Sequence, residues 1–169
     1  MSDPTAPHAG NAPDRHTIGL IADTHGLLRQ GVHAALAGVD LILHAGDVGD
    51  GVLEELAEIA PVKAVRGNTD PIGDPDLPLG RSLEIGGLVI HVSHGNELGV
   101  PTPAKVLAAY EGDVLVYGHS HRQIVERDGD RLVVNPGAAG PRRFNLMPSV
   151  ARLTIVDGFA EVEIIDLDA

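Results

Sequence analysis

The chain of 169 residues contains no cysteine. This absence excludes a small scaffold held by disulfides and a zinc site with thiolate ligands. No apolar run approaches the ~18 residues that a membrane-spanning helix needs. The first residues also lack the basic and apolar regions of a secretory signal. We therefore expect a cytoplasmic protein that does not enter a membrane.

Basic residues are scarce. Twelve Lys and Arg stand against 24 Asp and Glu, which gives a formal net charge of −12. Such an acidic surface repels long polyanions, so binding of long nucleic acids through a broad basic face is disfavoured. Any chemistry on a phosphate group would therefore need a local positive centre inside a negative protein.

The length and hydropathy predict one compact domain that follows a short tail. At ~150 residues per domain, the chain is long enough for one core. Its mean hydropathy of +0.07 indicates enough apolar surface to offset the chain entropy lost on folding. Residues 1–15 combine prolines with small polar residues and show no hydrophobic periodicity. We expect a disordered N-terminal tail over 1–15 and a single domain over 16–169.

The first half of the expected domain alternates strands with helices. Short apolar strands are expected over residues 17–22, 41–43 and 62–65. Apolar residues at helical spacing predict a helix between the first two strands, beginning after Gly26 and ending near Val39. Asp50 is placed to cap a second helix, whose first turn holds Glu54 and Glu55.

The second half is richer in strands. Strands over 81–85 and 88–93 flank Gly86-Gly87, which indicates a hairpin. Thr102 and Pro103 open a helix to about residue 110, and a strand follows over 113–117. Two more hairpins are expected to turn at residues 128–129 and 157–158. This order predicts an α/β fold of two sheets packed face to face with helices outside.

Polar residues follow five of the predicted strands, at the point where each strand ends. They are Asp23, His25, Asp47, Asn68, His94, His119 and His121. Because sites in α/β sheets form beyond the carboxyl ends of the strands, five loops can converge on one place. Each pattern alone is more often ordinary turn or capping chemistry. Their joint occurrence at five strand ends indicates a metal site.

The ligand set is a mixture of oxygen and nitrogen. It suits Mn²⁺, Fe²⁺, Zn²⁺ or Co²⁺ better than Ca²⁺ or Mg²⁺. Seven ligands are too many for one such ion and suit two. Two divalent ions among two carboxylates leave a positive centre that can attract and polarise a phosphate. Nearby His44 either orients the ligand Asp47 without touching the metal, or is simply a buried histidine whose hydrogen bonds are satisfied.

The residues resemble the calcineurin-like metallophosphoesterase superfamily, whose motifs are D-x-H, G-D, G-N-H-[D/E], H and G-H-x-H. Here they read Asp23-Thr24-His25, Gly46-Asp47, Gly67-Asn68-Thr69-Asp70, His94 and Gly118-His119-Ser120-His121. The short length and the segment Asn135-Pro136-Gly137 resemble its small branch of bacterial and archaeal phosphodiesterases. That branch also includes the metallophosphoesterase-like subunit of the retromer coat.

The resemblance implies a four-layer αββα sandwich with two divalent ions, Mn²⁺ being preferred and Fe, Zn, Co or Ni being the alternatives. One ion would be held by Asp23, His25, Asp47 and His121. The other would be held by Asp47, Asn68, His94 and His119, so that Asp47 bridges the two.

Two positions depart from the family pattern. Thr69 stands where many relatives have a histidine thought to protonate the leaving oxygen. Threonine cannot serve as an acid near neutral pH. Poor leaving groups are therefore expected to react up to ~10²–10⁴-fold more slowly than in an enzyme that has the histidine. Ala138 replaces the usual serine of the Asn-Pro-Gly-Ser segment, which removes one hydroxyl.

The resulting hypothesis is a phosphodiesterase that hydrolyses small phosphodiesters by in-line attack of a metal-bridging hydroxide. The expected catalytic residues are Asp47, Asn68, His94 and Asp70, the last orienting the Asn68 loop. The alternatives are a phosphomonoesterase or pyrophosphatase with the same two ions, and a protein-binding scaffold of the retromer-subunit type.

The partner expected is a small phosphoester, with no long nucleic acid and no membrane. Association into a homo-oligomer is a further expectation from the family. Arg142 and Arg143 lie in a Gly-Pro-rich loop, where they contact substrate phosphate or are ordinary solvated charges.

Overall fold

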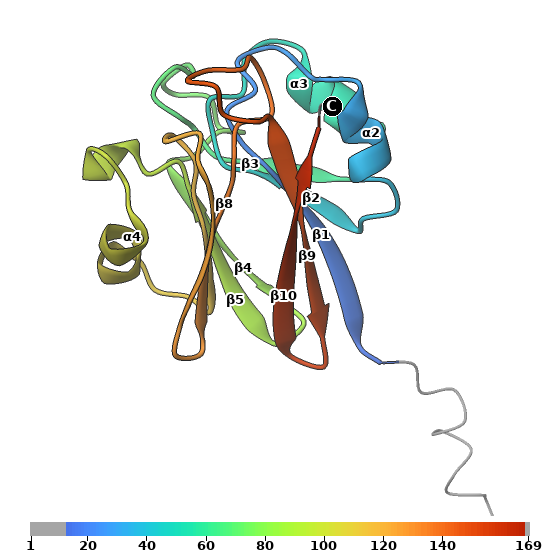
Figure 1. Cartoon of the computed structure of the whole chain (residues 1–169), viewed down its shortest axis with the longest axis vertical. Helices are drawn as coiled ribbons and strands as arrows, with labels where there is room; N and C mark the ends of the chain where they lie inside the picture. The colour runs from blue at the N-terminus through green and yellow to red at the C-terminus, as the bar shows by residue number, and fades with distance from the viewer. Residues whose placement is uncertain (1–12, 168–169) are drawn as a thin grey trace, which may run out of the picture.

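Two five-stranded sheets face each other in the computed structural model, which describes residues 13–167 (Figure 1). The strand order is β10-β9-β1-β2-β3 in the first sheet and β4-β5-β6-β8-β7 in the second. Short helices cover the outer faces, so the α/β class and the αββα layering are confirmed. Residues 1–12 of the predicted tail lie outside the described residues.

The elements have the following bounds. The first sheet consists of β1 (Arg15–Ile21), β2 (Leu41–His44), β3 (Val62–Ala64), β9 (Ser149–Val156) and β10 (Phe159–Asp166). The second consists of β4 (Gly80–Ile85), β5 (Leu88–Ser93), β6 (Val114–Val116), β7 (Gln123–Asp128) and β8 (Arg131–Pro136). The helices are α2 (Gly31–Ala35), α3 (Val52–Leu56), the 3₁₀ turn η1 (Asn96–Leu98) and α4 (Pro103–Ala109).

The carboxyl ends of six strands meet at one end of the molecule. β1, β2 and β3 pair in parallel in the first sheet, and β5, β6 and β8 pair in parallel in the second. Parallel strands end at the same edge of a sheet. The loops that follow them therefore gather at the upper end of Figure 1.

The main core lies between the sheets. Alternate residues point inward from each strand, such as Ile18 and Leu20 of β1 and Leu43 of β2. They meet Val92 of β5 and Val134 of β8 from the opposite sheet. All five are at most 1% exposed, so this apolar layer sets the distance between the two sheets.

The helices on the first sheet are shorter than the apolar periodicity predicts. The expected helix ending near Val39 is reduced to α2: the backbone leaves the helix at its C-cap Leu36, and Gly38 then turns the chain with a φ of 81°. The expected cap at Asp50 is wrong: Gly51 occupies the N-cap of α3, and no side chain caps it. No helix within residues 13–167 is long and apolar enough to cross a membrane.

The predicted turns around the second sheet are largely confirmed. Gly86 and Gly87 have φ values of 59° and 85°, the left-handed conformation that a two-residue hairpin loop needs. Thr102 caps α4 by accepting a hydrogen bond from the backbone N–H of Lys105, as expected. The hairpin expected at residues 128–129 turns one residue later, between Asp128 and Arg131.

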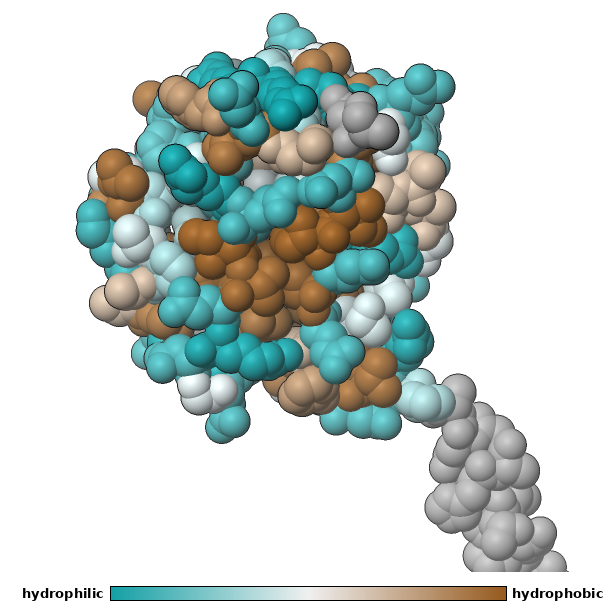
Figure 2. All heavy atoms as spheres, in the orientation of Figure 1, coloured by the Kyte–Doolittle hydropathy of each residue, from teal (hydrophilic) through white to brown (hydrophobic). Residues whose placement is uncertain are grey.

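The sandwich has an open seam where edge strands β7 and β10 run near each other. Two contacts bridge it: Gln123 Nε2 donates to Asp166 Oδ1 at 2.7 Å, and the Arg127 guanidinium donates to the carbonyl of Ala160. Figure 2 shows an apolar patch on this face of the molecule. Val125 of β7 is 47% exposed, so the seam leaves part of the apolar surface in contact with water.

The inter-sheet core can be tested at Leu43, which is fully buried. We expect Leu43→Ala to lower the free energy of unfolding by about 2–5 kcal/mol, because it leaves a cavity between the sheets. Urea denaturation measures the change. Leu79→Ala is the control, since Leu79 is 56% exposed and its loss should change stability by less than about 0.5 kcal/mol. Equal losses in the two variants would contradict this account of the core.

Candidate metal centre

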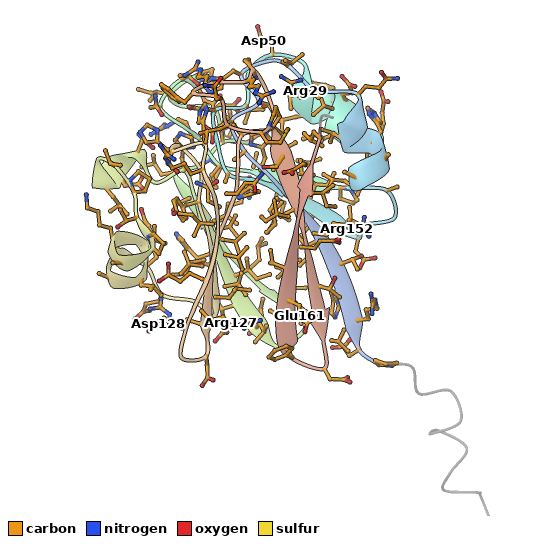
Figure 3. All side chains as sticks on the ribbon, in the orientation of Figure 1. Arg29, Asp50, Arg127, Asp128, Arg152 and Glu161 are labelled. Carbon is orange, nitrogen blue, oxygen red and sulfur yellow. The ribbon has the colours of Figure 1, made fainter. Side chains whose placement is uncertain are left out.

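All seven predicted ligand residues lie in the loops beyond the carboxyl ends of the strands. The ligand atoms of six of them form two groups of three, and the atoms of each group lie within 4.8 Å of one another. The groups are Asp23, His25 and His121, and Asp47, His94 and His119. The loops belong to the end of the molecule that carries Asp50 and Arg29 in Figure 3, opposite Arg127 and Asp128.

The first group surrounds one carboxylate oxygen. Asp23 Oδ1 lies 3.5 Å from Nε2 of His121 and 3.9 Å from Nε2 of His25. Within residues 13–167, neither Asp23 Oδ1 nor His25 Nε2 has a hydrogen-bond partner, although both atoms are buried. A buried carboxylate oxygen without a partner is costly. A cation held between it and the two imidazoles fits this arrangement.

The second group includes the amide of Asn68. Asn68 Oδ1 lies 3.1 Å from both His94 Nε2 and His119 Nδ1. Asp47 Oδ2 lies 3.2 Å from His94 Nε2. One carboxylate oxygen, one amide oxygen and two imidazole nitrogens thus face a common point, which is a mixed oxygen and nitrogen set suited to a divalent transition metal.

Asp47 lies between the two groups. The same Oδ2 atom that faces His94 is 3.7 Å from His25 Nε2, which belongs to the first group. Its other oxygen, Oδ1, accepts a hydrogen bond of 2.9 Å from the backbone N–H of Thr69. One oxygen is therefore anchored and the other faces both groups, which fits the bridging role expected from the family pattern.

The pKa values at the second group follow from this packing. Burial alone would raise the pKa of Asp47, but hydrogen bonds from His94 and Thr69 outweigh it and lower the pKa. Burial would lower the pKa of His94, but the carboxylates of Asp47 and Asp23 outweigh it and raise the pKa. For His119, burial and then the neighbouring His94 lower the pKa.

Most of the ligand residues have a backbone conformation that L-residues rarely adopt. Eight non-glycine residues among those described have a positive φ. Five of them carry predicted ligands: Asp23 (54°), His25 (48°), Asp47 (57°), His119 (70°) and His121 (63°). Such strain clusters at functional sites. Motif spacing does not reveal this feature.

Asp70 acts on the loops and does not face either ligand group. Its Oδ2 accepts hydrogen bonds of 2.8 Å from the backbone N–H groups of Asp47 and Gly67. Its Oδ1 accepts from Val48 and Gly49. A Cβ at Gly67 would collide with the Asp47 carboxylate, so the close approach of the two loops requires glycine here.

His44 joins two of the ligand loops. Its Nδ1 accepts from the backbone N–H of Gly46 at 3.1 Å, so Nε2 carries the proton and donates to Thr24 Oγ1 at 2.9 Å. Thr24 Oγ1 donates in turn to the carbonyl of Val48 at 2.6 Å. His44 is thus a satisfied buried histidine, one of the two alternatives left open by the sequence. It links the loop of Asp23 to that of Asp47.

Asn135 is a positioning residue that the sequence indicates only through its Asn-Pro-Gly segment. Its buried amide Nδ2 donates to the carbonyl of Gly118 at 3.2 Å and to Ser120 Oγ at 3.0 Å. These bonds fix the loop that carries His119 and His121. Arg142 and Arg143 are exposed, and neither guanidinium forms an ion pair with another residue of the described part.

Comparison with known proteins decides the family. The chain matches the calcineurin-like phosphoesterase superfamily domain over residues 17–158. It belongs to that superfamily. A protein of Methanocaldococcus jannaschii named "Probable metallophosphoesterase" is 36% identical over 150 residues, or 83% of this chain and 76% of that protein. A "Phosphodiesterase" of the same organism is 30% identical over 139 residues, or 71% of this chain and 82% of that protein.

Solved structures share the fold. Vacuolar Protein Sorting 29 from Cryptosporidium parvum superposes with a TM-score of 0.75 at 23% identity and covers 92% of this chain and 99% of its own. A novel archaeal phosphodiesterase superposes with a TM-score of 0.68 at 23% identity, covering 88% and 99%. The superfamily is one of metal-dependent hydrolases, so the chain is a member of a phosphoesterase family with two candidate ligand groups.

The buried His44 predicts a pH-dependent stability. Burial lowers the pKa of His44 to about 3. The unfolded chain takes up this proton below pH ~6.5 and the native protein does not, so stability falls as the pH drops from 6.5 towards 3. Each unit lowers the free energy of unfolding by up to ~1.4 kcal/mol.

We expect the His44→Gln variant, which does not titrate, to lack this contribution. Between pH 7.5 and 5.0 the wild type should lose about 2 kcal/mol more than the variant. Urea denaturation in EDTA measures both, so that metal release does not contribute. Parallel curves for the two proteins would show that folding does not lower the pKa of His44 and would contradict this prediction.

Proposed function

We propose that the protein is a two-metal phosphodiesterase that hydrolyses small phosphodiesters. The observation that carries the proposal is the pair of ligand groups around Asp23 and Asp47, whose facing oxygens and imidazole nitrogens lie 3.2–3.9 Å apart. In the first group, Asp23 Oδ1 and His25 Nε2 are buried and have no hydrogen-bond partner among the described residues. Divalent ions at ~2.0–2.2 Å from such atoms would account for these separations.

The residues present suit two divalent ions, with Mn²⁺ as our preferred candidate and Fe, Zn, Co or Ni as alternatives. When bound, the ions would supply an activated water and polarise the phosphate oxygens for in-line displacement. Asp23 and Asp47 would hold the positive charge, and their neighbours would fix the geometry. Water would add to phosphorus while one P–O ester bond breaks, which yields a monoester and an alcohol.

The open side of the centre lies at Asn68 and Thr69, both of which are exposed. Thr69 offers its backbone N–H to Asp47 and has no side chain that can protonate a leaving group near neutral pH. We therefore propose that good leaving groups react faster. The relatives named phosphodiesterases support the diester over a monoester. The net charge of −12 supports small substrates over long nucleic acids.

The proposal is tested by assaying metal-stripped protein on bis-p-nitrophenyl phosphate and p-nitrophenyl phosphate, before and after Mn²⁺ is added. We expect turnover only with the metal, and a higher kcat/KM for the diester. A preference for the monoester would indicate a metal-dependent phosphomonoesterase in place of a phosphodiesterase. A folded protein that turns over neither ester with any divalent metal would support a protein-binding scaffold, and its oligomeric state would become the next question.

The bridging role of Asp47 is tested by Asp47→Asn. Asparagine tolerates the left-handed conformation that Asp47 adopts, so the loop should be retained while the charge is lost. We expect kcat to fall by more than ~100-fold. Mutating a residue that only hydrogen-bonds to a metal ligand already costs ~10–100-fold in metal affinity or activity, and Asp47 is itself an expected ligand. Bound Mn²⁺, measured by elemental analysis, should fall below two ions per chain.

Asp50→Asn is the matched control for that experiment. Asp50 is an exposed carboxylate three residues away that belongs to neither ligand group. It should leave the metal content and kcat close to those of the wild type. Unchanged metal content in Asp47→Asn would overturn the bridging assignment.

A further inference from the structure

The loop between β8 and β9 lies against the candidate centre. Its base is tied to the loop of Asp23, where Gly140 N–H donates to the carbonyl of Asp23 at 3.2 Å. A Cβ at Gly140 would collide with the carbonyl of Thr24, so the two loops are in direct contact. Ser149 closes the base by donating its N–H to Ala138. The tip of the loop is linked to the centre through a cavity, because Asn145 and Leu146 line the same cavity as His121.

The tip is a tight turn with an unexpected residue. Leu146 N–H donates to the carbonyl of Arg143 at 2.8 Å, and the two central residues, Phe144 and Asn145, have φ values of 54° and 59°. A turn with two left-handed central residues favours Asn, Asp or Gly. Asn145 fits this preference and Phe144 does not. The Phe144 ring is also 78% exposed, so neither the backbone nor the core accounts for it.

A cavity of about 400 Å³ opens next to this turn and includes His121 in its wall. Apolar side chains form part of the lining, namely Ile124, Leu146 and Met147. Polar groups lie beside them: Gln123 Nε2 donates to Asp166 Oδ1, while the amide oxygen of Gln123 and the second carboxylate oxygen of Asp166 make no hydrogen bond within residues 13–167. A cavity of this size with apolar walls and a few acceptors suits a planar group that carries N–H donors.

We propose that this cavity and Phe144 bind the nucleobase of a nucleotide phosphodiester, so that the substrate class of the site is small nucleotide esters. This inference rests on the proposed phosphodiesterase function. The base stacks against apolar side chains and one of its N–H groups donates to the free acceptors, while the phosphate of the same nucleotide lies at the centre that includes His121. Phe144 is the exposed aromatic residue of the turn whose next two residues, Asn145 and Leu146, line the cavity. Base–aromatic stacking accepts any base, because every base has a π-face.

The test compares two diesters that share p-nitrophenol as the leaving group: thymidine 5′-(p-nitrophenyl phosphate) and methyl p-nitrophenyl phosphate. Since only the nucleoside differs, the ratio of their kcat/KM values reports its binding. We expect the Mn²⁺-loaded wild type to favour the nucleotide, and Phe144→Asn to lower the ratio about tenfold. Asparagine suits the turn, so the loop should keep its shape.

Phe159→Ala provides the control. Phe159, the other phenylalanine of the chain, is 57% exposed and packs against Arg127 at the far end of the molecule. Its loss should leave the ratio unchanged. Equal kcat/KM values for the two diesters in the wild type, or an unchanged ratio in Phe144→Asn, would overturn the inference and leave the phosphodiesterase proposal intact.

Calorimetry gives a readout that does not need turnover. We expect AMP, whose base carries an exocyclic amino group, to bind Mn²⁺-loaded wild type about tenfold more tightly than ribose 5-phosphate, and Phe144→Asn to lose this difference. Equal affinities would reject the nucleobase cavity. Tighter AMP binding by a protein that hydrolyses neither diester would instead reject the phosphodiesterase function and retain the nucleotide site.

Discussion

Two buried carboxylates, Asp23 and Asp47, lie 3.8 and 3.2 Å from the same atom, His94 Nε2, and the loops around them are arranged to hold both charges there. Burying a charge without a partner is costly. Within residues 13–167, each carboxylate accepts a hydrogen bond from one backbone N–H, that of His119 for Asp23 and that of Thr69 for Asp47. The remaining oxygens face imidazoles at 3.2–3.9 Å. Divalent cations are the partners that would satisfy both the charge and the spacing.

A rigid arrangement of loops keeps the carboxylates in place. Asp70 holds the Asp47 loop to the Gly67 loop, His44 connects it with Thr24, and Asn135 fixes the loop of His119. None of these three residues points a free ligand atom into either group. They instead fix the loops by hydrogen bonds. These bonds keep the ligand residues in the left-handed conformation, which an unrestrained loop would leave.

Sequence patterns predict the sheets and the convergence of the ligands because both follow from hydrophobic runs and strand ends. They do not predict the φ values of Asp23 and Asp47, which depend on hydrogen bonds from loops distant in sequence. The helix near Val39 is overestimated because the apolar spacing continues through Leu36 and Val39, whose side chains pack inward although the backbone leaves the helix at Leu36. Asp50 resembles a cap in sequence, but Gly51 takes that position.

The cavity beside His121 crosses the seam of the sandwich. Gln123 and Ile124 belong to β7 of one sheet, whereas Asp166 belongs to β10 of the other. Its width therefore depends on the thickness of the apolar layer that separates the sheets. A change of side-chain volume deep between the sheets, remote from every ligand, is expected to alter which groups the cavity admits. Substitutions in the core between the sheets can thus change which ligands the cavity accepts while the metal-binding loops stay the same.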